Sequence, residues 1–446
     1  MNKRDSEAAA ALLLRLGWGE AAAEADADVV IVNTCSVRGK AEDKALGKLK
    51  MLAAAKRKTR LVAVGVMGCM AQRLGDELFR RVPGLDFAIG TRRLAALPSV
   101  VECILAGRGP VLDTDQDAEI SEDVAGHTAG AVTAFVNILF GCDRGCSYCI
   151  VPSVRGREWS RPASAILDEV RRLADGGVRE VTLLGQSVMM YGRRNEVFGD
   201  GARSPGGFTE PLPRLLEAVD SVAGIRRVRF TSGHPSGCTG ELARAMRDLP
   251  AVCEHLHVPV QSGSDRVLAR MRRGYTADDY RRAVERMREA APDLGLTTDV
   301  IVGFPGETAE DFEATRGLME EMAFDNAYVF KYSPRPGTSA AEWPDDVTDE
   351  EKVRRNSVLL VDQDVRGQRL NERMVGGRPV EVLLEGASLR NSQRWSGRTR
   401  SNVTTVFEPV EGIREGDLVR VAVDRAMPQT VYGKIVGSAV PGGGAI

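Results

Sequence analysis

Several features that would assign the chain to other protein classes are missing from its sequence. No stretch of the 446 residues approaches the roughly 18 consecutive apolar residues of a membrane-spanning helix. The first residues, from Met1 to Glu7, lack the apolar run of a secretory signal, so we expect a cytoplasmic protein. Internal repeats are absent as well. A chain of this length exceeds one ordinary core and predicts two or three domains.

An excess of positive charge is also absent. The formal net charge of −2 argues against a chain that is basic overall, although local basic clusters can still bind nucleic acid. The hydrophobic fraction of 43% and the charged fraction of 27% are typical of a soluble globular protein. In the expected compartment, the eight cysteines are better explained by metal binding or catalysis than by disulfides.

Strands and helices alternate in the N-terminal part of the chain. Short apolar segments at 29–33 and 60–65 read as buried parallel strands, and helical patterns cover 8–16 and 40–55. This alternation predicts an open α/β sheet, although the chain begins directly with a helix. Residues 108–130 have little apolar periodicity and read as a linker.

The remaining two thirds of the chain divide into two patterns. Six strands, each followed by a helical segment, predict a complete or partial parallel barrel, with its chemistry at the carboxyl ends of the strands. We place them at 134–138, 180–184, 227–231, 256–259, 298–302 and 327–331. Beyond residue 368, short strands separated by turn residues predict a small all-β barrel, and we expect a disordered tail at 440–446.

The strongest local signal is a loop with three cysteines, Cys142, Cys146 and Cys149, just past a predicted strand end. Three thiolates at this spacing can hold three irons of a [4Fe–4S] cluster and leave the fourth iron open for S-adenosylmethionine (SAM). A zinc site is the alternative, but it would need a fourth ligand, and no further cysteine or histidine lies nearby in the sequence. The loop therefore predicts an iron–sulfur cluster.

The residues around this loop resemble the radical-SAM methylthiotransferase family. The resemblance continues through most of the chain, in the segments Asn33-Thr34-Cys35-Ser36, Gly68-Cys69-Met70-Ala71-Gln72-Arg73, Pro259-Val260-Gln261-Ser262-Gly263-Ser264, Val302-Gly303-Phe304-Pro305-Gly306-Glu307-Thr308 and Gly397-Arg398-Thr399. It is closest to members that convert isopentenyladenosine beside the anticodon of transfer RNA to its 2-methylthio derivative. The Gln261 to Ser264 run favours RNA-acting members over those that modify a ribosomal protein.

The resemblance implies an α/β fold class with three parts: an N-terminal flavodoxin-like domain at 1–108, a partial (βα)6 TIM-type radical-SAM barrel at 131–367 after a linker at 109–130, and a TRAM barrel that binds RNA at 368–439. It also implies two SAM molecules and a second, auxiliary [4Fe–4S] cluster. Two ligands of that cluster map to Cys35 and Cys69, whereas the family's third cysteine, which follows an opening strand, has no match here. Cys103, Cys238 and Cys253 read as buried small hydrophobes.

Weaker signals concern SAM. By resemblance, Tyr148 lies near the adenine and Gln186 near the amino group of SAM, and the backbone at Gly303 and Gly306 approaches the adenine. For Tyr148 simple packing is the alternative, and for the two glycines it is a plain strand-to-helix turn. His234 and His257, near predicted strand ends, either face the site or are structural.

Basic residues near the rim and in the C-terminal module are candidates for RNA contacts. The set comprises Arg155, Arg157, Arg161, Arg394, Trp395 and Arg398, and a second rim cluster comprises Arg270, Arg272 and Arg273. The alternatives are a solvated charged face for the rim arginines and a core position for Trp395. The expected partners are transfer RNA and an electron donor such as flavodoxin or ferredoxin, and the sulfur source is unassigned.

The leading prediction is a transfer-RNA methylthiotransferase acting on isopentenyladenosine. Two alternatives stay open at this point. One is the same chemistry on threonylcarbamoyl-adenosine at the same position. The other is an RNA-binding protein without sulfur transfer, because the auxiliary cluster has only two of its three expected cysteines.

Overall fold

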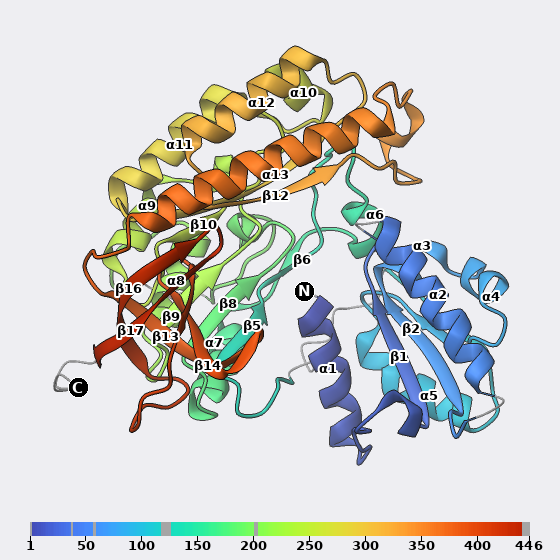
Figure 1. Cartoon of the computed structure of the whole chain (residues 1–446). Coiled ribbons are helices and arrows are strands. Elements are labelled where there is room, and N and C mark those ends of the chain that lie inside the picture. Colours follow the sequence, from blue (N-terminus) through green and yellow to red (C-terminus); the bar gives the residue numbers. More distant parts are fainter. Residues whose placement is uncertain (1, 37–38, 57–58, 117–125, 200–203, 439–446) are drawn as a thin grey trace. The chain divides into compact units, whose positions relative to one another are not determined.

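The computed structural model describes residues 2–36, 39–56, 59–116, 126–199 and 204–438 (Figure 1). The chain divides into two compact units. The first contains 1–129, 139–159 and 333–341, and the second contains 130–138, 160–332 and 342–446. The cysteine loop thus belongs to the same unit as the N-terminal segment. In the described part of the chain, no helix has the length and apolar character needed to cross a bilayer.

The first unit is built on a four-stranded parallel sheet in the order β1-β2-β3-β4. Its strands are β1 (Val29–Thr34), β2 (Ala63–Gly68), β3 (Phe87–Ile89) and β4 (Val111–Asp113). Its helices are α1 (Asn2–Arg15), α2 (Gly39–Ala55), α3 (Cys69–Leu74), α4 (Glu77–Arg81) and α5 (Leu97–Leu105). The strand β6 (Leu139–Phe140) and the helix α6 (Val151–Arg155) flank the cysteine loop, which is followed by β7 (Trp159–Ser160).

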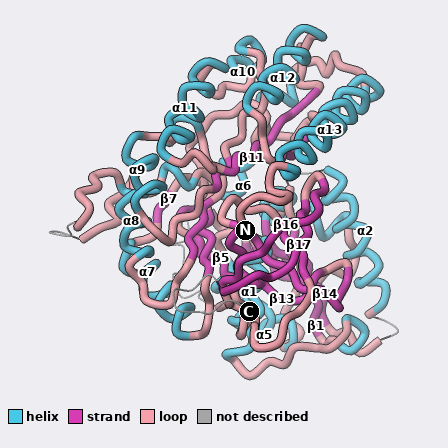
Figure 2. Tube along the Cα trace, turned by 60° about the vertical axis from the view of Figure 1, so that its left-hand side comes forward, coloured by secondary structure: helices cyan, strands magenta, loops and turns pink. Residues whose placement is uncertain are grey.

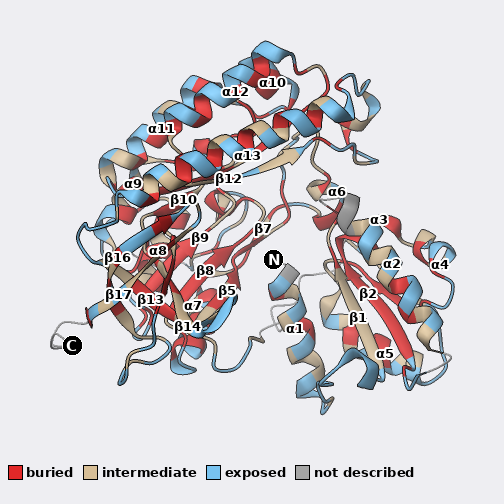
Figure 3. Ribbon diagram, in the orientation of Figure 1, coloured by how far each residue is buried: buried red, intermediate tan, exposed pale blue. Residues whose placement is uncertain are grey.

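Apolar residues on both faces of this sheet explain why both are covered. Alternate side chains of β1 and β2 pack with α2, α3 and α4 on one face, through residues such as Val32, Val64 and Leu49. The other set packs with α1 and α5, through residues such as Ile31 and Val101. The strand β2 is buried along its whole length (Figure 3). An open α/β sheet is therefore confirmed, and the finer flavodoxin-like assignment stays a prediction.

The second unit contains six parallel strands in two three-stranded sheets, β5-β8-β9 and β10-β11-β12. The strands are β5 (Thr133–Asn137), β8 (Glu180–Leu184), β9 (Arg227–Phe230), β10 (His255–His257), β11 (Gly295–Val302) and β12 (Asn326–Lys331). The helices are α7 (Ala163–Asp175), α8 (Pro211–Asp220), α9 (Gly240–Asp248), α10 (Asp265–Arg270), α11 (Ala277–Ala290), α12 (Ala309–Met322) and α13 (Asp349–Glu372). An isolated bridge pairs Val228 of β9 with Val252, three residues before β10, and all six predicted strands are observed.

The C-terminal strands form a closed barrel in the order β13-β14-β15-β17-β16. Figure 2 labels four of them, β13, β14, β16 and β17. They are β13 (Val380–Ser388), β14 (Asn391–Thr399), β15 (Thr404–Phe407), β16 (Leu418–Met427) and β17 (Thr430–Ser438). Inward residues such as Val382, Phe407 and Val421 form the core of this barrel. The small all-β barrel is confirmed, and its assignment as a TRAM domain stays a prediction.

Two buried arginines of β9 attach this C-terminal barrel to the six-stranded part. Arg227, with a fully buried side chain, donates hydrogen bonds to the Arg398 carbonyl (2.5 Å) and pairs with Glu381 (2.9 Å). Arg229 donates to the carbonyls of Thr399 and Arg400, each at 2.7 Å. Carbonyl groups of the C-terminal barrel accept hydrogen bonds from the terminal nitrogens of both guanidinium groups away from water, so the barrel is an integral part of this unit.

Two expectations about the chain need correction. The strand β4 lies within the predicted linker, where it pairs with β3. Cys103 was predicted to be buried. It lies in a helix as expected, but it is half-buried, with its Sγ 3.2 Å from the Arg108 carbonyl oxygen. Cys238 and Cys253, each 1% exposed, are buried as predicted. The predicted tail at 440–446 lies outside the described residues.

Candidate functional site

The cysteine loop is closed at its base by a close backbone approach. The Cys142 N–H donates to the Gly156 carbonyl at 3.2 Å. Gly141 has a φ of +72°, and a Cβ at this position would lie 2.1 Å from the Arg157 carbonyl oxygen. Only glycine fits such a left-handed residue packed against backbone. The two ends of the loop are therefore next to each other, and the three cysteines lie on the chain between these ends.

The thiols of this loop fit the ligand chemistry of an iron–sulfur cluster. All eight cysteines lie in the described part of the chain, and none forms a disulfide. Burial raises the pKa of the Cys142 thiol, the Arg144 backbone N–H lowers it, and the nearby Cys146 thiol raises it again. Three soft sulfur donors on one loop suit iron. Among the described residues, no three Cys, His, Asp or Glu side chains converge as preassembled metal ligands, so the assignment depends on the donor set.

The segment after the three cysteines is anchored to residues of the N-terminal sheet domain. The Thr91 hydroxyl donates to the Val154 carbonyl (2.6 Å), and Arg92 donates to the Arg157 carbonyl (2.9 Å). Cys69 packs with Ile150 and Val154 in a small buried cluster. Within this unit, side chains that follow β3 thus donate hydrogen bonds to backbone carbonyls after the cysteines, and these bonds hold the cysteine loop to the carboxyl edge of the sheet.

Cys35 and Cys69 follow the ends of β1 and β2, which are adjacent parallel strands. Gly68 is the last residue of β2 and precedes Cys69, and a Cβ there would meet the Thr34 carbonyl oxygen at 2.7 Å. The strand ends therefore approach closely, and both cysteines lie at the same edge of the sheet. Cys35 is half-buried and Cys69 is buried, and their role as ligands of an auxiliary cluster stays a prediction.

Arg155, expected to contact RNA, is instead buried beside Cys69. Its guanidinium pairs with Asp5 at 2.8 Å and its side chain is 7% exposed. Burial acts to lower the pKa of Arg155, but the charges of Asp5 and Cys69 outweigh it and the net shift is upward. Arg161 is also buried and pairs with Glu169 at 2.7 Å. Both arginines neutralise internal carboxylates, which corrects the predicted phosphate contacts.

The other candidates for RNA contacts differ in exposure. Arg157 is exposed, whereas Arg394 and Arg398 are partly exposed, and the latter pairs with Glu385 at 3.3 Å. Trp395 packs against the core of the C-terminal barrel, in agreement with the alternative reading. In the second rim cluster Arg273 is buried and its guanidinium donates to the Pro259 carbonyl, whereas Arg270 and Arg272 are exposed.

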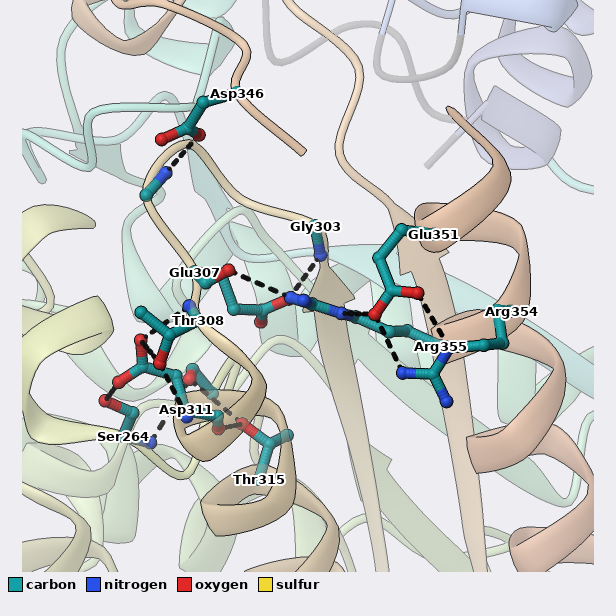
Figure 4. A network of polar contacts seen from close by, with 12 residues as sticks. Ser264, Gly303, Glu307, Thr308, Asp311, Thr315, Asp346, Glu351, Arg354 and Arg355 are labelled. Atoms are coloured by element: carbon teal, nitrogen blue, oxygen red, sulfur yellow. Dashed lines mark hydrogen bonds and ion pairs between the residues drawn. The ribbon is translucent and has the colours of Figure 1, made fainter. Parts of the chain in front are cut away.

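Gly303 and Gly306 form the turn between β11 and α12, both with positive φ. The Gly303 N–H donates to the Glu307 carboxylate at 2.6 Å, and Arg355 pairs with the same carboxylate at 2.6 Å (Figure 4). A strand-to-helix turn with its own hydrogen-bond network explains both glycines. The sequence prediction missed Glu307 and Arg355, although an acid directly after Gly303-x-x-Gly306 is a usable signal.

The remaining SAM and histidine candidates fall in both units. Tyr148 is half-buried in the cysteine loop, in the first unit. Gln186 is half-buried just past the end of β8, in the second unit. His234 is buried with its Nδ1 2.9 Å from the Ser236 hydroxyl, and His257 lies 3.0 Å from the Thr297 hydroxyl. Both histidines thus have polar partners close by, as structural histidines do.

Comparison with known proteins identifies this arrangement. A family model described as the radical SAM superfamily matches residues 136–319, and one described as uncharacterized protein family UPF0004 matches residues 1–90. A radical S-adenosylmethionine methyltransferase, TsrM from Kitasatospora setae, has a similar fold, with a TM-score of 0.51 and 16% identity over 70% of this chain and 66% of that one. The cysteine loop and these matches define the class, a radical SAM protein, whose cofactors are a [4Fe–4S] cluster and SAM.

Relatives with much higher identity span nearly the whole chain. The tRNA-2-methylthio-N(6)-dimethylallyladenosine synthase of Akkermansia muciniphila is 43% identical, over 97% of this chain and 96% of that protein. The protein of the same name from Methylacidiphilum infernorum is 40% identical, over 97% of this chain and 92% of that one. The chain belongs to the family of these tRNA-2-methylthio-N(6)-dimethylallyladenosine synthases, which confirms the predicted resemblance.

Proposed function

We propose that the protein is a methylthiotransferase that converts the dimethylallyl (isopentenyl) adenosine beside the anticodon of transfer RNA to its 2-methylthio derivative. The observation that carries this conclusion is the 43% identity over 97% of the chain to an enzyme named for this product. The observed fold is consistent with it, because the cysteine loop follows the first strand of a radical SAM barrel.

Cys142, Cys146 and Cys149 are the proposed ligands of the [4Fe–4S] cluster. When bound, this cluster supplies the electron that cleaves SAM. The chain's own contribution is to hold three thiols on one loop, closed at its base by the Cys142 N–H and Gly156 carbonyl. Cys142 is buried, with 9% of its surface exposed. The half-buried Tyr148 and Gln186 are proposed contacts of SAM.

Cys35 and Cys69 are the proposed ligands of an auxiliary [4Fe–4S] cluster. Support comes from their position at one edge of a parallel sheet, which is where side chains after adjacent strands meet. The fit is incomplete within this sequence, because the family pattern uses three thiolates there. Transfer RNA and a small reducing protein such as flavodoxin or ferredoxin are the proposed partners.

Nucleoside mass spectrometry of transfer RNA from a strain without the gene, and from the same strain carrying it, tests this function. We expect the 2-methylthio-dimethylallyl nucleoside only when the gene is present. A 2-methylthio-threonylcarbamoyl nucleoside would instead identify the related substrate, and no methylthiolated nucleoside would overturn the proposal.

Single Cys→Ala variants test the ligand assignment. Cys142→Ala should lose iron after anaerobic reconstitution and lose SAM cleavage. Cys103→Ala is the matched control, since this half-buried cysteine lies in α5 and has no proposed ligand role. Equal iron content in the two variants would contradict the assignment.

A further inference from the structure

One face of the sheet β10-β11-β12 is polar at successive positions. The parallel register places Thr297 of β11 between His257 of β10 and Asn326 of β12. Two residues further along β11, on the same face, Asp299 lies beside Tyr328. The alternating side chains on the opposite face include the buried apolar residues Leu256 and Val300. Parallel barrels usually fill their interior with bulky apolar side chains. The polar face therefore indicates a cavity in place of a packed core.

A cavity of about 400 Å³ lies against this polar face. Its volume is within the range of about 300–1,000 Å³ typical of small-molecule sites. Residues of the C-terminal barrel line the opposite wall, among them Arg398, Asn402 and Thr404, and Asn371 of α13 contributes from the end of its helix. The cavity thus lies where the C-terminal barrel meets the six-stranded part, within one unit.

The lining groups combine donors, acceptors and one accessible ring. The carboxamides of Asn326, Asn371 and Asn402 each combine a donor and an acceptor, and the protein already uses part of this capacity. The Asn326 side-chain oxygen accepts from the Ala327 N–H, and the Asn371 side-chain nitrogen donates to the Met427 and Pro428 carbonyls. Tyr328 is 50% exposed. Asp325 carries the carboxyl group among the described lining residues. This carboxyl accepts a hydrogen bond from the Leu296 N–H of β11 at 2.7 Å.

The basic groups of the cavity are oriented by polar contacts. Arg398 donates to the Asn402 side-chain oxygen at 3.2 Å and remains partly exposed. His255 is 5% exposed, and its Nε2 lies 3.4 Å from the Asn402 amide nitrogen. Burial and the adjacent Arg229 guanidinium hold the pKa of His255 well below its ordinary value, so the ring is neutral at physiological pH. The same Nε2 lies 3.4 Å from the Thr297 hydroxyl, so this ring orients Asn402 and Thr297 in the wall of the cavity.

We propose that this cavity binds one unpaired nucleotide of the RNA substrate. Carboxamide side chains read the edges of splayed-out bases, an aromatic ring stacks on them, and an arginine meets the phosphate. The nucleotide is a different one from the reacting adenosine, because His255 and Asn326 are the first residues of their strands. Chemistry in such barrels takes place at the opposite, carboxyl ends. The inference rests on the proposed function for its choice of RNA.

Binding of an anticodon stem-loop RNA to the full-length holoenzyme tests the site. Tyr328→Ala should weaken binding about tenfold, equivalent to about 1.4 kcal/mol, since one stacked base contributes about 1–3 kcal/mol. Tyr328→Phe keeps the ring and should bind within about twofold of wild type. Val361→Ala, at an exposed position of α13, is the control and should bind as wild type does.

A scan of abasic substitutions through the RNA loop identifies the nucleotide. At one position, other than the modified one, removing the base should weaken RNA binding to the wild-type protein about tenfold. Removing the same base should not weaken RNA binding to Tyr328→Ala. If no position is coupled to Tyr328 in this way, the inference is overturned. SAM cleavage without RNA should be equal in all variants, which verifies that the fold and the cluster site are intact.

Binding of free AMP tests whether the cavity takes a nucleotide of RNA or a free nucleotide, because both carry a base and a phosphate. If AMP binds wild type and loses affinity in Tyr328→Ala while RNA affinity is unchanged, the site takes a free nucleotide and its assignment to RNA is wrong. The binding assay is independent of product formation. Coupling between Tyr328 and one RNA position without any methylthiolated product would contradict the proposed reaction and leave the nucleotide site standing.

Discussion

The buried ion pair between Arg355 and Glu307 provides a quantitative test of the turn after β11. The Glu307 side chain is fully buried and accepts hydrogen bonds from Arg355 Nη1 and the Gly303 N–H, each at 2.6 Å. Arg355→Ala removes the counter-ion and leaves a buried carboxylate with one N–H donor. Removing one partner of such a pair costs about 3–5 kcal/mol. We expect a loss of this size in the free energy of unfolding of the second unit.

The loss should depend on pH. Burial raises the pKa of Glu307 above its ordinary value, and the hydrogen bonds from Arg355 and the Gly303 N–H partly oppose that shift. A carboxyl whose pKa is raised by folding contributes stability below its unfolded-state pKa and loses that contribution as pH rises through its folded-state pKa. Arg355→Ala raises the folded pKa further. The variant should therefore differ least from wild type in acid and most at neutral pH.

Arg354→Ala is the matched control. Arg354 is the adjacent arginine, its side chain is 54% exposed, and it pairs with Glu351 at 2.7 Å, the same carboxylate that Arg355 also contacts (Figure 4). Exposed pairs contribute about 0–1 kcal/mol. Urea midpoints of the full chain and amide exchange of the Gly303 N–H, measured at acidic and neutral pH, compare the two variants. Equal losses in both, or a loss in Arg355→Ala that is independent of pH, would refute this account.

Three further predictions follow from buried polar groups. Arg227→Ala should free the C-terminal barrel for limited proteolysis while the rest of the second unit stays resistant, because this side chain bonds to the barrel backbone; an unchanged digestion pattern would argue against it. Burial raises the pKa of Cys238 to about 12, so mass spectrometry after iodoacetamide treatment at neutral pH should show Cys103 alkylated well before Cys238. Arg155→Ala should lower the thermal midpoint, with partial recovery in Arg155→Lys, whereas an RNA-contacting role would weaken RNA binding and leave the midpoint unchanged.

The strands of the chain were predictable because their signals are local. Buried parallel strands are short apolar runs, and both β1 and β8 were found this way within one residue of their observed ends. Short strands carry too little of this signal. The strand β4 has three residues and lies among Gly, Pro and Asp, so its pairing with β3 supplies information that its own composition lacks.

The cysteine positions could be predicted for a different reason. Spacing within one loop is visible in the sequence, so Cys142, Cys146 and Cys149 were identified by separation alone. That Cys35 and Cys69 meet at one sheet edge required the resemblance, because 34 positions in the sequence separate them. The structure adds the physical reason, which is the close approach of Gly68 to the Thr34 carbonyl.

Partners of the arginines could not be predicted, because an ion pair between distant positions leaves no trace in spacing. Arg155 and Arg157 are two residues apart beside the cysteine loop, and the same role was predicted for both. The structure separates them, since Asp5 holds Arg155 inside while Arg157 is exposed. The same holds for Arg227, whose partners lie in the C-terminal barrel.

The difference between buried, paired arginines and exposed arginines changes which residues we expect to contact RNA. An arginine that already neutralises a buried carboxylate cannot also neutralise a phosphate without leaving that carboxylate unpaired, which costs several kcal/mol. Arg155 and Arg161 are excluded on this ground. Arg157, Arg270 and Arg272 are exposed, and Arg394 is partly exposed. Arg398 lines the polar cavity beside Tyr328, and its partner Glu385 is not buried, with a side chain that is 29% exposed. The salt-dependent part of RNA affinity should therefore come from these exposed and partly exposed arginines, and it should survive substitutions of the buried pairs that leave the fold intact.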